Sequence, residues 1–199
     1  MAKIDFWYSI GSTYSYLTVM RIDRVAQDHG LDVTWKPFDV RTIMMEYGNS
    51  PFIGKPVKAA HMWRDIARRA PRYGLSPSLP APYPLNDLAL PNAIALLGMD
   101  EGWGVEFTRA AYRRWFEEGL LPDEGAGLRD SLREAGQNPD TTIERAQSPE
   151  QAKRLADQTR QARDLGVFGS PSFVVAGELF WGDDRLADAV QWARDGRLS

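Results

Sequence analysis

The sequence predicts an α/β fold in which a βαβ half and a ββα half are separated by a long helical insertion. Four short apolar runs lack helical periodicity and are typical of strands: 3–9, 31–38, 172–175 and 178–181. The first two flank an amphipathic segment, and the last two are joined by the two-residue turn Ala176-Gly177 and followed by a helix. Between the two halves the strand signal disappears and helical patterns take over.

The first half contains a predicted strand-to-helix turn with two hydroxyl side chains. From Tyr14 onward apolar residues recur every three or four positions until Gly30, which predicts one helix over 14–30. The strand that follows makes a right-handed parallel crossover. Ser12 or Thr13 could cap this helix by accepting from a first-turn N–H group. Alternatively, a hydroxyl beside the positive end of the helix dipole could stabilise a ligand anion such as a thiolate.

The insertion is predicted to contain helices over 41–47, 57–73, 91–97, 105–118 and 124–135, and a proline-rich irregular loop over 76–84 that could rim a pocket. Several polar and aromatic side chains on these helices have a structural interpretation. Arg64, Arg68, Arg69 and Arg72 are interpreted as a solvated face rather than an anion site, and His61 as a core or surface residue rather than a catalytic one. Trp103, Tyr112, Trp115 and Phe116 are interpreted as core residues. The expected division is one unit formed by 1–40 and 148–199, with 41–147 as the insertion.

Composition excludes several classes of function. The net charge of −3, with both signs interspersed, disfavours nucleic-acid and anionic-membrane partners. No apolar run is long enough to span a bilayer, and a strand already at residues 3–9 leaves no room for a signal peptide, so a cytoplasmic protein is expected. With no cysteine and two histidines, no metal site is expected and a Ser/His/Asp triad has little material. Any reactive thiol must therefore come from a ligand.

The segment 166–185 carries most of the predicted chemistry. Pro171 stands at the head of a strand, where proline is tolerated. Asp183 and Asp184 fall at the cap and first turn of the last helix, where carboxylates are favourable and can also hold an amine. A helix over 149–165 precedes this segment. The complete order of elements is that of a thioredoxin fold.

Three stretches carry a family resemblance: GVFGSPSF at 166–173, FWGDDRL at 180–186 and STYSYL at 12–17. With them the chain resembles the 2-hydroxychromene-2-carboxylate isomerase family, which is related to the kappa-class glutathione transferases and more distantly to DsbA-type oxidoreductases. The resemblance runs nearly end to end. It implies a homodimeric isomerase that uses glutathione as a cofactor on an aromatic 2-hydroxychromene-2-carboxylate-type substrate.

The resemblance also implies roles for individual residues. Ser12 matches the serine that contacts the glutathione sulfur, in place of the reactive cysteine of the redox relatives. Pro171 matches the cis-proline of thioredoxin folds, and Ser170 before it offers its backbone to the cysteinyl part of the tripeptide, like an added strand. The residues that match the segment binding the γ-glutamyl end are Trp181, Gly182, Asp183 and Asp184.

Segments of the insertion resemble family segments near the second-substrate pocket: Gly48–Pro51, Pro56–Lys58 and Tyr83–Asn86. The candidate substrate-binding residues are therefore Asn49, Lys58, Tyr83 and Asn86. The chain departs from the family pattern at three positions: Thr13, where proline is usual, Met44, where some isomerases carry a substrate-binding lysine, and His61, where tyrosine is common.

The implied mechanism is ionisation of bound glutathione by the Ser12 hydroxyl and the helix end. The thiolate would add to a conjugated double bond, allow rotation about the resulting single bond, and leave unchanged. Two rival functions stay open: a kappa-like glutathione transferase or peroxidase, and a non-catalytic thioredoxin-fold binding module. Cationic and hydrogen-bonding residues that converge on a carboxylate would favour the isomerase, and a purely apolar pocket would favour transfer.

Overall fold

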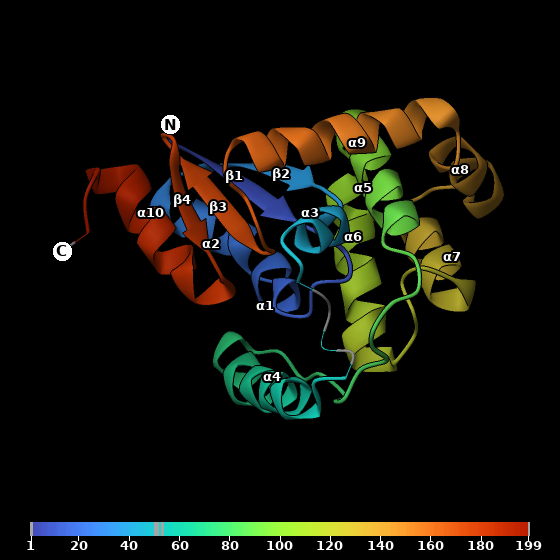
Figure 1. Cartoon of the computed structure of the whole chain (residues 1–199), viewed down its shortest axis with the longest axis horizontal. Coiled ribbons are helices and arrows are strands. Elements are labelled where there is room, and N and C mark those ends of the chain that lie inside the picture. Colours follow the sequence, from blue (N-terminus) through green and yellow to red (C-terminus); the bar gives the residue numbers. More distant parts are fainter. Residues whose placement is uncertain (1, 50–51, 53, 199) are drawn as a thin grey trace.

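A computed structural model describes residues 2–49, 52 and 54–198 of the chain. These residues form a mixed four-stranded sheet in the order β2-β1-β3-β4, with β1 parallel to β2 and β3 antiparallel to both β1 and β4. The strands are β1 (Lys3–Tyr8), β2 (Asp32–Pro37), β3 (Ser172–Val175) and β4 (Glu178–Trp181). The thioredoxin-like fold class and the four predicted strands are confirmed (Figure 1).

The hairpin between β3 and β4 has the predicted two-residue turn. Ala176 and Gly177 have φ angles of 50° and 89°, which are the positive values that a type I′ turn requires at both central positions. Val175 pairs with Glu178 and Ser172 with Trp181, so the two strands are in full register. This register places the end of β4 beside the start of β3.

The single helix predicted over 14–30 is wrong: the structure divides it. It forms α1 (Ser15–Val19) and α2 (Ile22–His29), and Gly30 ends α2 in the left-handed conformation with φ of 64°. The break falls at Met20 and Arg21, and Arg21 leaves the helical region with φ of −137°. Its guanidinium reaches the backbone and side chain of Asp183, so a tertiary contact overrides the local helical pattern.

The helical insertion is confirmed, with one helix more than the five that the sequence predicted, when two short helical turns are counted with the helices that they continue. Its helices are α3 (Val40–Glu46), α4 (Pro56–Arg69), η1 (Ala70–Tyr73), α5 (Ala89–Glu101), α6 (Gly104–Arg113), η2 (Arg114–Glu118), α7 (Gly125–Glu134) and α8 (Pro139–Ala146). The unpredicted helix is α8. The Asn138 side chain caps it by accepting from the N–H groups of Asp140 and Thr141, and Pro139 occupies its first turn.

The insertion returns to the sheet through α9 (Pro149–Asp164), and the chain ends with η3 (Asp183–Arg185) and α10 (Leu186–Asp195). Figure 1 shows α9 running across α5 on one side of the molecule, whereas α4 lies on the opposite side. The last helix, α10, packs against β1, β3 and β4 at the end of the molecule that is far from α7 and α8.

An aromatic cluster links the sheet to the insertion. The Phe6 ring stacks on Phe173 at 5.6 Å between centroids and meets Trp35 edge-on at 5.0 Å. The Tyr8 hydroxyl forms a hydrogen bond of 2.8 Å with the Thr108 hydroxyl on α6. The aromatic residues predicted as core are all buried, namely Trp103, Tyr112, Trp115 and Phe116. Within the part of the chain that the structure describes, no helix has the length and apolar character needed to cross a membrane.

Candidate functional site

The strand pairing brings the predicted site segments together at one edge of the sheet. Trp7 near the end of β1 pairs with Ser172 at the start of β3, because the two strands are antiparallel. Residues that follow β1 therefore lie beside residues that precede β3. The result is a hydrogen bond of 2.6 Å from the Ser12 hydroxyl to the backbone carbonyl of Ser170, which lies 158 positions away in the sequence.

The hydroxyls of Ser12 and Thr13 do not cap α1, so that interpretation is wrong. Thr13 donates instead to the sulfur of Met62 at 2.8 Å, and Tyr14 at the N-cap makes no side-chain capping bond. The backbone has already begun to turn, since the N–H of Ser12 bonds the carbonyl of Ser9. The Ser12 hydroxyl therefore does not contribute a capping hydrogen bond to α1. Because α1 is only 5 residues long, it presents a smaller dipole than the continuous predicted helix.

Two buried side chains of the insertion fix the loop that carries Ser12. Asn92 on α5 accepts from the N–H of Ile10 at 2.8 Å and donates to the Ile10 carbonyl at 3.0 Å. The Tyr112 hydroxyl on α6 contacts the carbonyls of Ser9 and Ser12 at 2.8 and 3.1 Å. Sequence reasoning did not assign these contacts. The available signal for Asn92 was a lone amide inside an apolar helical run.

The conformation of Gly11 in the same loop strongly favours glycine. Its φ angle is 128°, and a Cβ atom at this position would lie 2.7 Å from the Leu88 side chain. The conformation of Gly11 therefore directs the chain from β1 toward α1 and sets the position of Ser12.

The segment opposite Ser12 has the backbone conformation that the resemblance implied. The Ser170–Pro171 peptide bond is cis. The Ser170 side chain is turned away from the site, because its hydroxyl accepts from the Ser9 N–H at 2.9 Å and pairs with the Ser15 hydroxyl at 2.8 Å. Its backbone is the part of the residue that faces Ser12.

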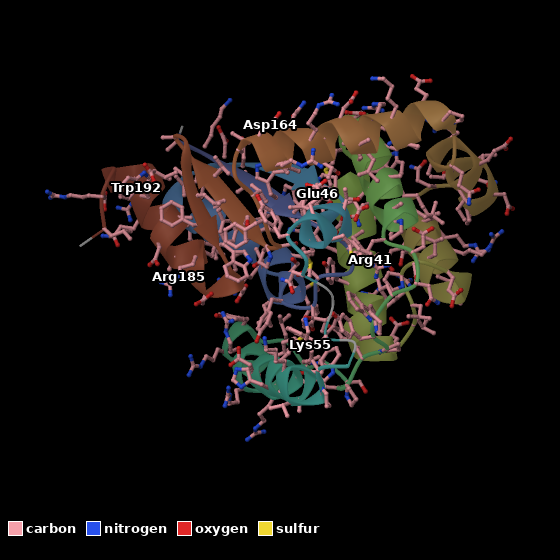
Figure 2. All side chains as sticks on the ribbon, viewed as in Figure 1. Arg41, Glu46, Lys55, Asp164, Arg185 and Trp192 are labelled. Carbon is pink, nitrogen blue, oxygen red and sulfur yellow. The ribbon has the colours of Figure 1, made fainter. Side chains whose placement is uncertain are left out.

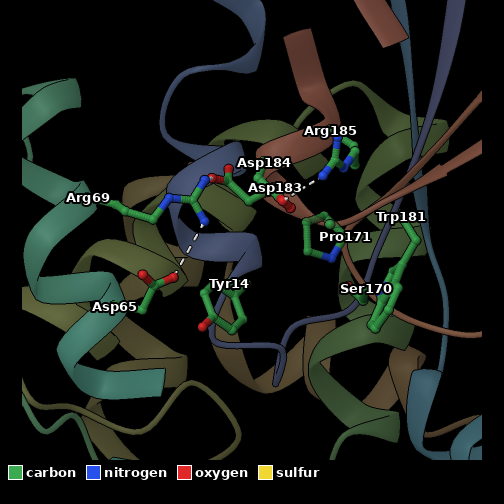
Figure 3. Close-up of a pocket in the computed structure, with 10 residues that line it drawn as sticks. Tyr14, Asp65, Arg69, Ser170, Pro171, Trp181, Asp183, Asp184 and Arg185 are labelled. Atoms are coloured by element: carbon green, nitrogen blue, oxygen red, sulfur yellow. Dashed lines mark hydrogen bonds and ion pairs between the residues drawn. The ribbon is translucent and has the colours of Figure 1, made fainter. Parts of the chain in front are cut away.

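A cavity of about 630 Å³, here called the polar cavity, opens beside this segment (Figure 3). It is lined by Tyr14, Asp65, Arg69, Ser170, Pro171, Trp181, Gly182, Asp183, Asp184 and Arg185. Figure 3 shows charged side chains of both signs around it, Asp65 and Arg69 from α4 on one side and Asp183, Asp184 and Arg185 from η3 on the other. A lining with both signs of charge suits a zwitterionic ligand group.

The two adjacent aspartates of η3 have different environments. The Asp183 carboxylate is fully buried, and it accepts from the Thr18 hydroxyl at 2.6 Å, from Arg21 at 2.9 Å and from Arg69. The Asp184 carboxylate is 57% exposed and has a looser ion pair with Arg185 at 3.4 Å. Asp184 is therefore accessible to a ligand amine, whereas Asp183 has its oxygens occupied and positions the arginines.

Arg69 does not belong to a solvated face, and that part of the prediction is wrong. Its side chain is only 16% exposed and bridges Asp183 to Asp65 on its own helix. Arg64, Arg68 and Arg72 are exposed as predicted. The position of Arg69 in the sequence could have indicated this burial, because it lies next to Ala70 on the buried face of the helix that also contains Met62 and Ile66.

Tyr14 stands between the walls of the polar cavity. Burial, together with the charge and hydrogen bond of Asp65, raises the pKa of its phenol to about 12, although the charges of Arg69 and Arg68 oppose the rise. Burial on its own would raise the pKa of Asp65, but hydrogen bonds from Arg68 and Tyr14 and the charge of Arg69 hold that pKa below its usual value. Tyr14 is therefore a neutral hydrogen-bonding group at physiological pH, and Asp65 is ionised.

A second cavity of about 450 Å³, here called the apolar cavity, adjoins the first and shares Tyr14, Ser170 and Trp181 with it. Its further lining residues include Ser12, Val40, Met44, Phe52, Leu85, Leu88 and Phe168. Of the candidate substrate-binding residues, Asn49 and Tyr83 line this cavity. Lys58 and Asn86 do not: Lys58 lies on the exposed side of α4, and the exposed Asn86 contributes only its backbone to this region. Ser50 and Pro51 lie outside the described residues.

Arg41 is the only charged residue among the described residues that line the apolar cavity, and sequence reasoning did not assign it. It belongs to the first turn of α3, the helix that follows β2 in the chain. The available signal was topology, because ligand sites of open α/β sheets lie beyond the carboxyl ends of parallel strands.

Two exposed aromatic rings form the rim between the cavities. Trp181 is 53% exposed, and its ring meets that of Phe168 at 4.8 Å between centroids. Gly169 lies directly under the Trp181 indole, so a larger residue there would collide with the indole nitrogen. The rim therefore offers an apolar surface to a ligand that extends from one cavity into the other.

The arrangement can hold a zwitterionic group in the polar cavity, an apolar group in the apolar cavity, and an anion beside the Ser12 hydroxyl. No cluster of three or more histidine, aspartate or glutamate side chains suited to a metal ion occurs within residues 2–49, 52 and 54–198.

Comparisons with known proteins identify one matching domain family and several similar proteins. Residues 3–191 match the family of DSBA-like thioredoxin domains. A 2-hydroxychromene-2-carboxylate isomerase of Sphingobium xenophagum is 29% identical over 92% of this chain and 93% of its own. A solved 2-hydroxychromene-2-carboxylate isomerase superposes with a TM-score of 0.83 at 26% identity, covering 94% of this chain and 91% of its own. Glutathione S-transferase kappa 1 of Caenorhabditis elegans is 24% identical over 96% of this chain and 92% of its own.

Proposed function

Because the chain belongs to the DSBA-like thioredoxin domain family, we propose that it is a glutathione-dependent isomerase of 2-hydroxychromene-2-carboxylate-type substrates. Relatives that carry this isomerase name span nearly the whole chain, and the kappa transferase relative supports glutathione as the thiol source. The observation that carries the proposal is the position of Ser12 in a chain that has no cysteine: Ser12 lines the apolar cavity, and its hydroxyl bonds the carbonyl of Ser170, which lines both cavities.

The lining of the polar cavity fits the tripeptide. A γ-glutamyl end carries an ammonium and a carboxylate, for which Asp184 and the N-terminal end of the helical segment beginning at Asp183 are suitable partners. Trp181 and Gly182 would pack against the same end. The backbone of Ser170 would pair with the cysteinyl residue, which directs the sulfur toward Ser12.

Ser12 would stabilise the sulfur as an anion. Its hydroxyl donates to the Ser170 carbonyl in the structure, so it must exchange this neutral acceptor for the sulfur. The exchange is favourable for a thiolate, because hydrogen bonds to charged acceptors are roughly twice as strong as neutral ones. The Ser170 carbonyl retains a second lone pair and can accept from the ligand backbone.

The chemistry that glutathione supplies when bound is the reversible addition of a thiolate to a conjugated double bond. The apolar cavity would hold the aromatic ring of the substrate and exclude water from the reacting bond. Tyr14 lines both cavities as a neutral phenol, so it can donate a hydrogen bond near the junction without adding a second negative charge.

The direct test measures isomerisation of 2-hydroxychromene-2-carboxylate with glutathione, with S-methylglutathione and without either. S-methylglutathione keeps the zwitterionic end but cannot form a thiolate, so it is the matched control. We expect turnover with glutathione alone and an unchanged glutathione concentration after many turnovers. Equal turnover in all three conditions would contradict the proposal.

The same assay separates the rival functions. Stoichiometric consumption of glutathione with an electrophile such as 1-chloro-2,4-dinitrobenzene, without isomerisation, would identify a transferase. Glutathione binding with neither reaction would identify a binding module. We also propose a homodimer, which light scattering of the purified protein would test.

A further inference from the structure

Among the described residues, the apolar cavity has one charged side chain on its wall, and that positive charge has no acidic partner. Arg41 forms no ion pair within the described part of the chain, unlike most other arginines of the insertion. Its guanidinium donates to two backbone carbonyls, to Leu85 at 2.7 Å and to Asn86 at 2.9 Å. Figure 2 shows Arg41 at the start of α3, facing the segment that leads into α5.

The carbonyl contacts fix the guanidinium without neutralising it. The Nε atom of Arg41 is buried and has no hydrogen-bond partner among the described residues. A buried donor on a charged group is costly when it is left without an acceptor. Arg41 therefore combines a held orientation with an uncompensated charge on the wall of a cavity that is otherwise apolar.

We infer that Arg41 is the specificity-determining residue of the apolar cavity, and that it binds the carboxylate of an aromatic carboxylic acid. This inference rests on the proposed function, and it assigns the substrate's carboxylate to a residue of this chain. The chemistry of the two groups matches, because a planar guanidinium recognises a carboxylate in a fixed geometry. An electrophile without a carboxylate would leave the charge of Arg41 uncompensated and would bind less well.

The surroundings of Arg41 support this orientation of the ligand. The charge of Arg41 reaches Tyr83. Burial raises the pKa of the Tyr83 phenol above its usual value, and a hydrogen bond with the Phe52 backbone and the charge of Arg41 each lower it in part. Tyr83 is also held edge-on against Trp63 at 6.0 Å between centroids. A carboxylate at Arg41 would thus have a phenol beside it, and the attached ring would extend along the apolar wall toward Ser12.

The test uses binding rather than turnover. The protein loaded with S-methylglutathione, which cannot react, is titrated by calorimetry with trans-cinnamate and with its neutral amide, trans-cinnamamide. We expect the wild-type protein to prefer the carboxylate. In Arg41→Met, cinnamate should bind about 10- to 100-fold more weakly, because a hydrogen-bonded charge pair is lost, whereas cinnamamide should change much less.

Three further variants keep the result interpretable. Arg41→Gln retains a donor for the Leu85 carbonyl without the charge, and it should show the same loss of preference if charge is responsible. Arg24→Met removes an arginine that is 86% exposed on α2 and should change neither affinity. Lys58→Met tests the rival cation. Melting temperatures of all variants report whether the fold is kept.

Each outcome decides the inference. Equal weakening of cinnamate and cinnamamide in Arg41→Met would mean a structural role and would overturn it. Unchanged affinities, or a loss of preference in Lys58→Met instead, would also overturn it. The protein could also prefer cinnamate through Arg41 and yet fail to isomerise 2-hydroxychromene-2-carboxylate. That result would refute the proposed function but would support the carboxylate site.

Discussion

Replacing Ser12 by alanine tests how the proposed site ionises a thiol. The substitution removes one hydroxyl from the apolar cavity, beside the Ser170 carbonyl, and leaves the polar cavity intact, since that cavity is lined by other residues. We therefore expect Ser12→Ala to retain most of its glutathione affinity at low pH. The pKa of the bound thiol should rise instead.

The structure sets the size of this change. The Ser12 hydroxyl must leave the Ser170 carbonyl, at 2.6 Å, before it can donate to sulfur. That neutral hydrogen bond is worth about 0.5–1.5 kcal/mol, and a bond to a charged acceptor about 1.5–3 kcal/mol, so the net gain is roughly 1–1.5 kcal/mol. At about 1.4 kcal/mol per pKa unit, Ser12 lowers the thiol pKa by about one unit from a free value near 8.5.

The assay is a pH titration of thiolate absorbance in the ultraviolet for the wild-type protein and for Ser12→Ala, each saturated with glutathione. We expect a bound pKa about one unit lower in the wild type. Linkage gives a second readout. Because the pKa is lower in the bound state, glutathione affinity should rise with pH between the bound and free pKa values, by up to about tenfold.

Controls separate the sulfur from other titrating groups. S-methylglutathione carries the same amine and carboxylates but no thiol, so any pH dependence that it shares with glutathione has another origin. Ser12→Thr keeps a hydroxyl and should resemble the wild type more than alanine does. Equal thiol pKa values in the wild type and in Ser12→Ala would refute the role of Ser12.

Three other predictions follow from the site geometry. Ser12→Cys should form a mixed disulfide with oxidised glutathione, releasing one glutathione, much faster than Ser76→Cys on the exposed proline-rich loop. Mass spectrometry before and after reduction measures both rates, and equal rates would mean that the glutathione sulfur does not bind beside residue 12. Asp183→Ala should lower the free energy of unfolding by about 3–5 kcal/mol, because it leaves Arg21 and Arg69 without their buried carboxylate partner, whereas Asp184→Ala should have little effect. Equal destabilisation of the two variants in denaturant unfolding would contradict the assigned burial of Asp183. The pKa of Tyr14 is higher in the folded protein, at about 12, than its usual 10, so its contribution to stability is complete below pH 10 and lost as pH rises toward 12. Tyr14→Phe should therefore make the alkaline fall in unfolding free energy less steep, and an unchanged slope would speak against this environment.

The sheet and its hairpin were predictable because their signals are local. Apolar runs of strand length, with Ala176-Gly177 between two of them, are enough to define β3 and β4. The order of elements then brings the ends of β1 and β3 together, so the meeting of Ser12 with Ser170 followed from topology and from the family resemblance. The position of a residue in the fold could be predicted from the sequence more readily than the partners of its side chain.

The errors concern side chains whose partners are distant in the sequence. Arg21 interrupts the first helix because it pairs with Asp183, which is 162 positions away. Arg69 turns inward toward the same carboxylate across 114 positions. Helical periodicity describes which face a residue occupies, but it contains no information about a buried acid on another element. The same limit applied to Arg41, whose partners are backbone carbonyls.

The anchoring of the Ser12 loop by Asn92 and Tyr112 bears on how such proteins can diversify. Ser12 belongs to one half of the molecule, yet its position is fixed by amide and phenol groups of the inserted helices. The two parts are therefore not interchangeable modules: a chimera that grafts a foreign helical region onto this sheet would misplace the serine even if both parents were active. New substrate preferences should instead arise by exchange of wall residues such as Met44 and Phe52, which touch the cavity and leave those two anchors untouched.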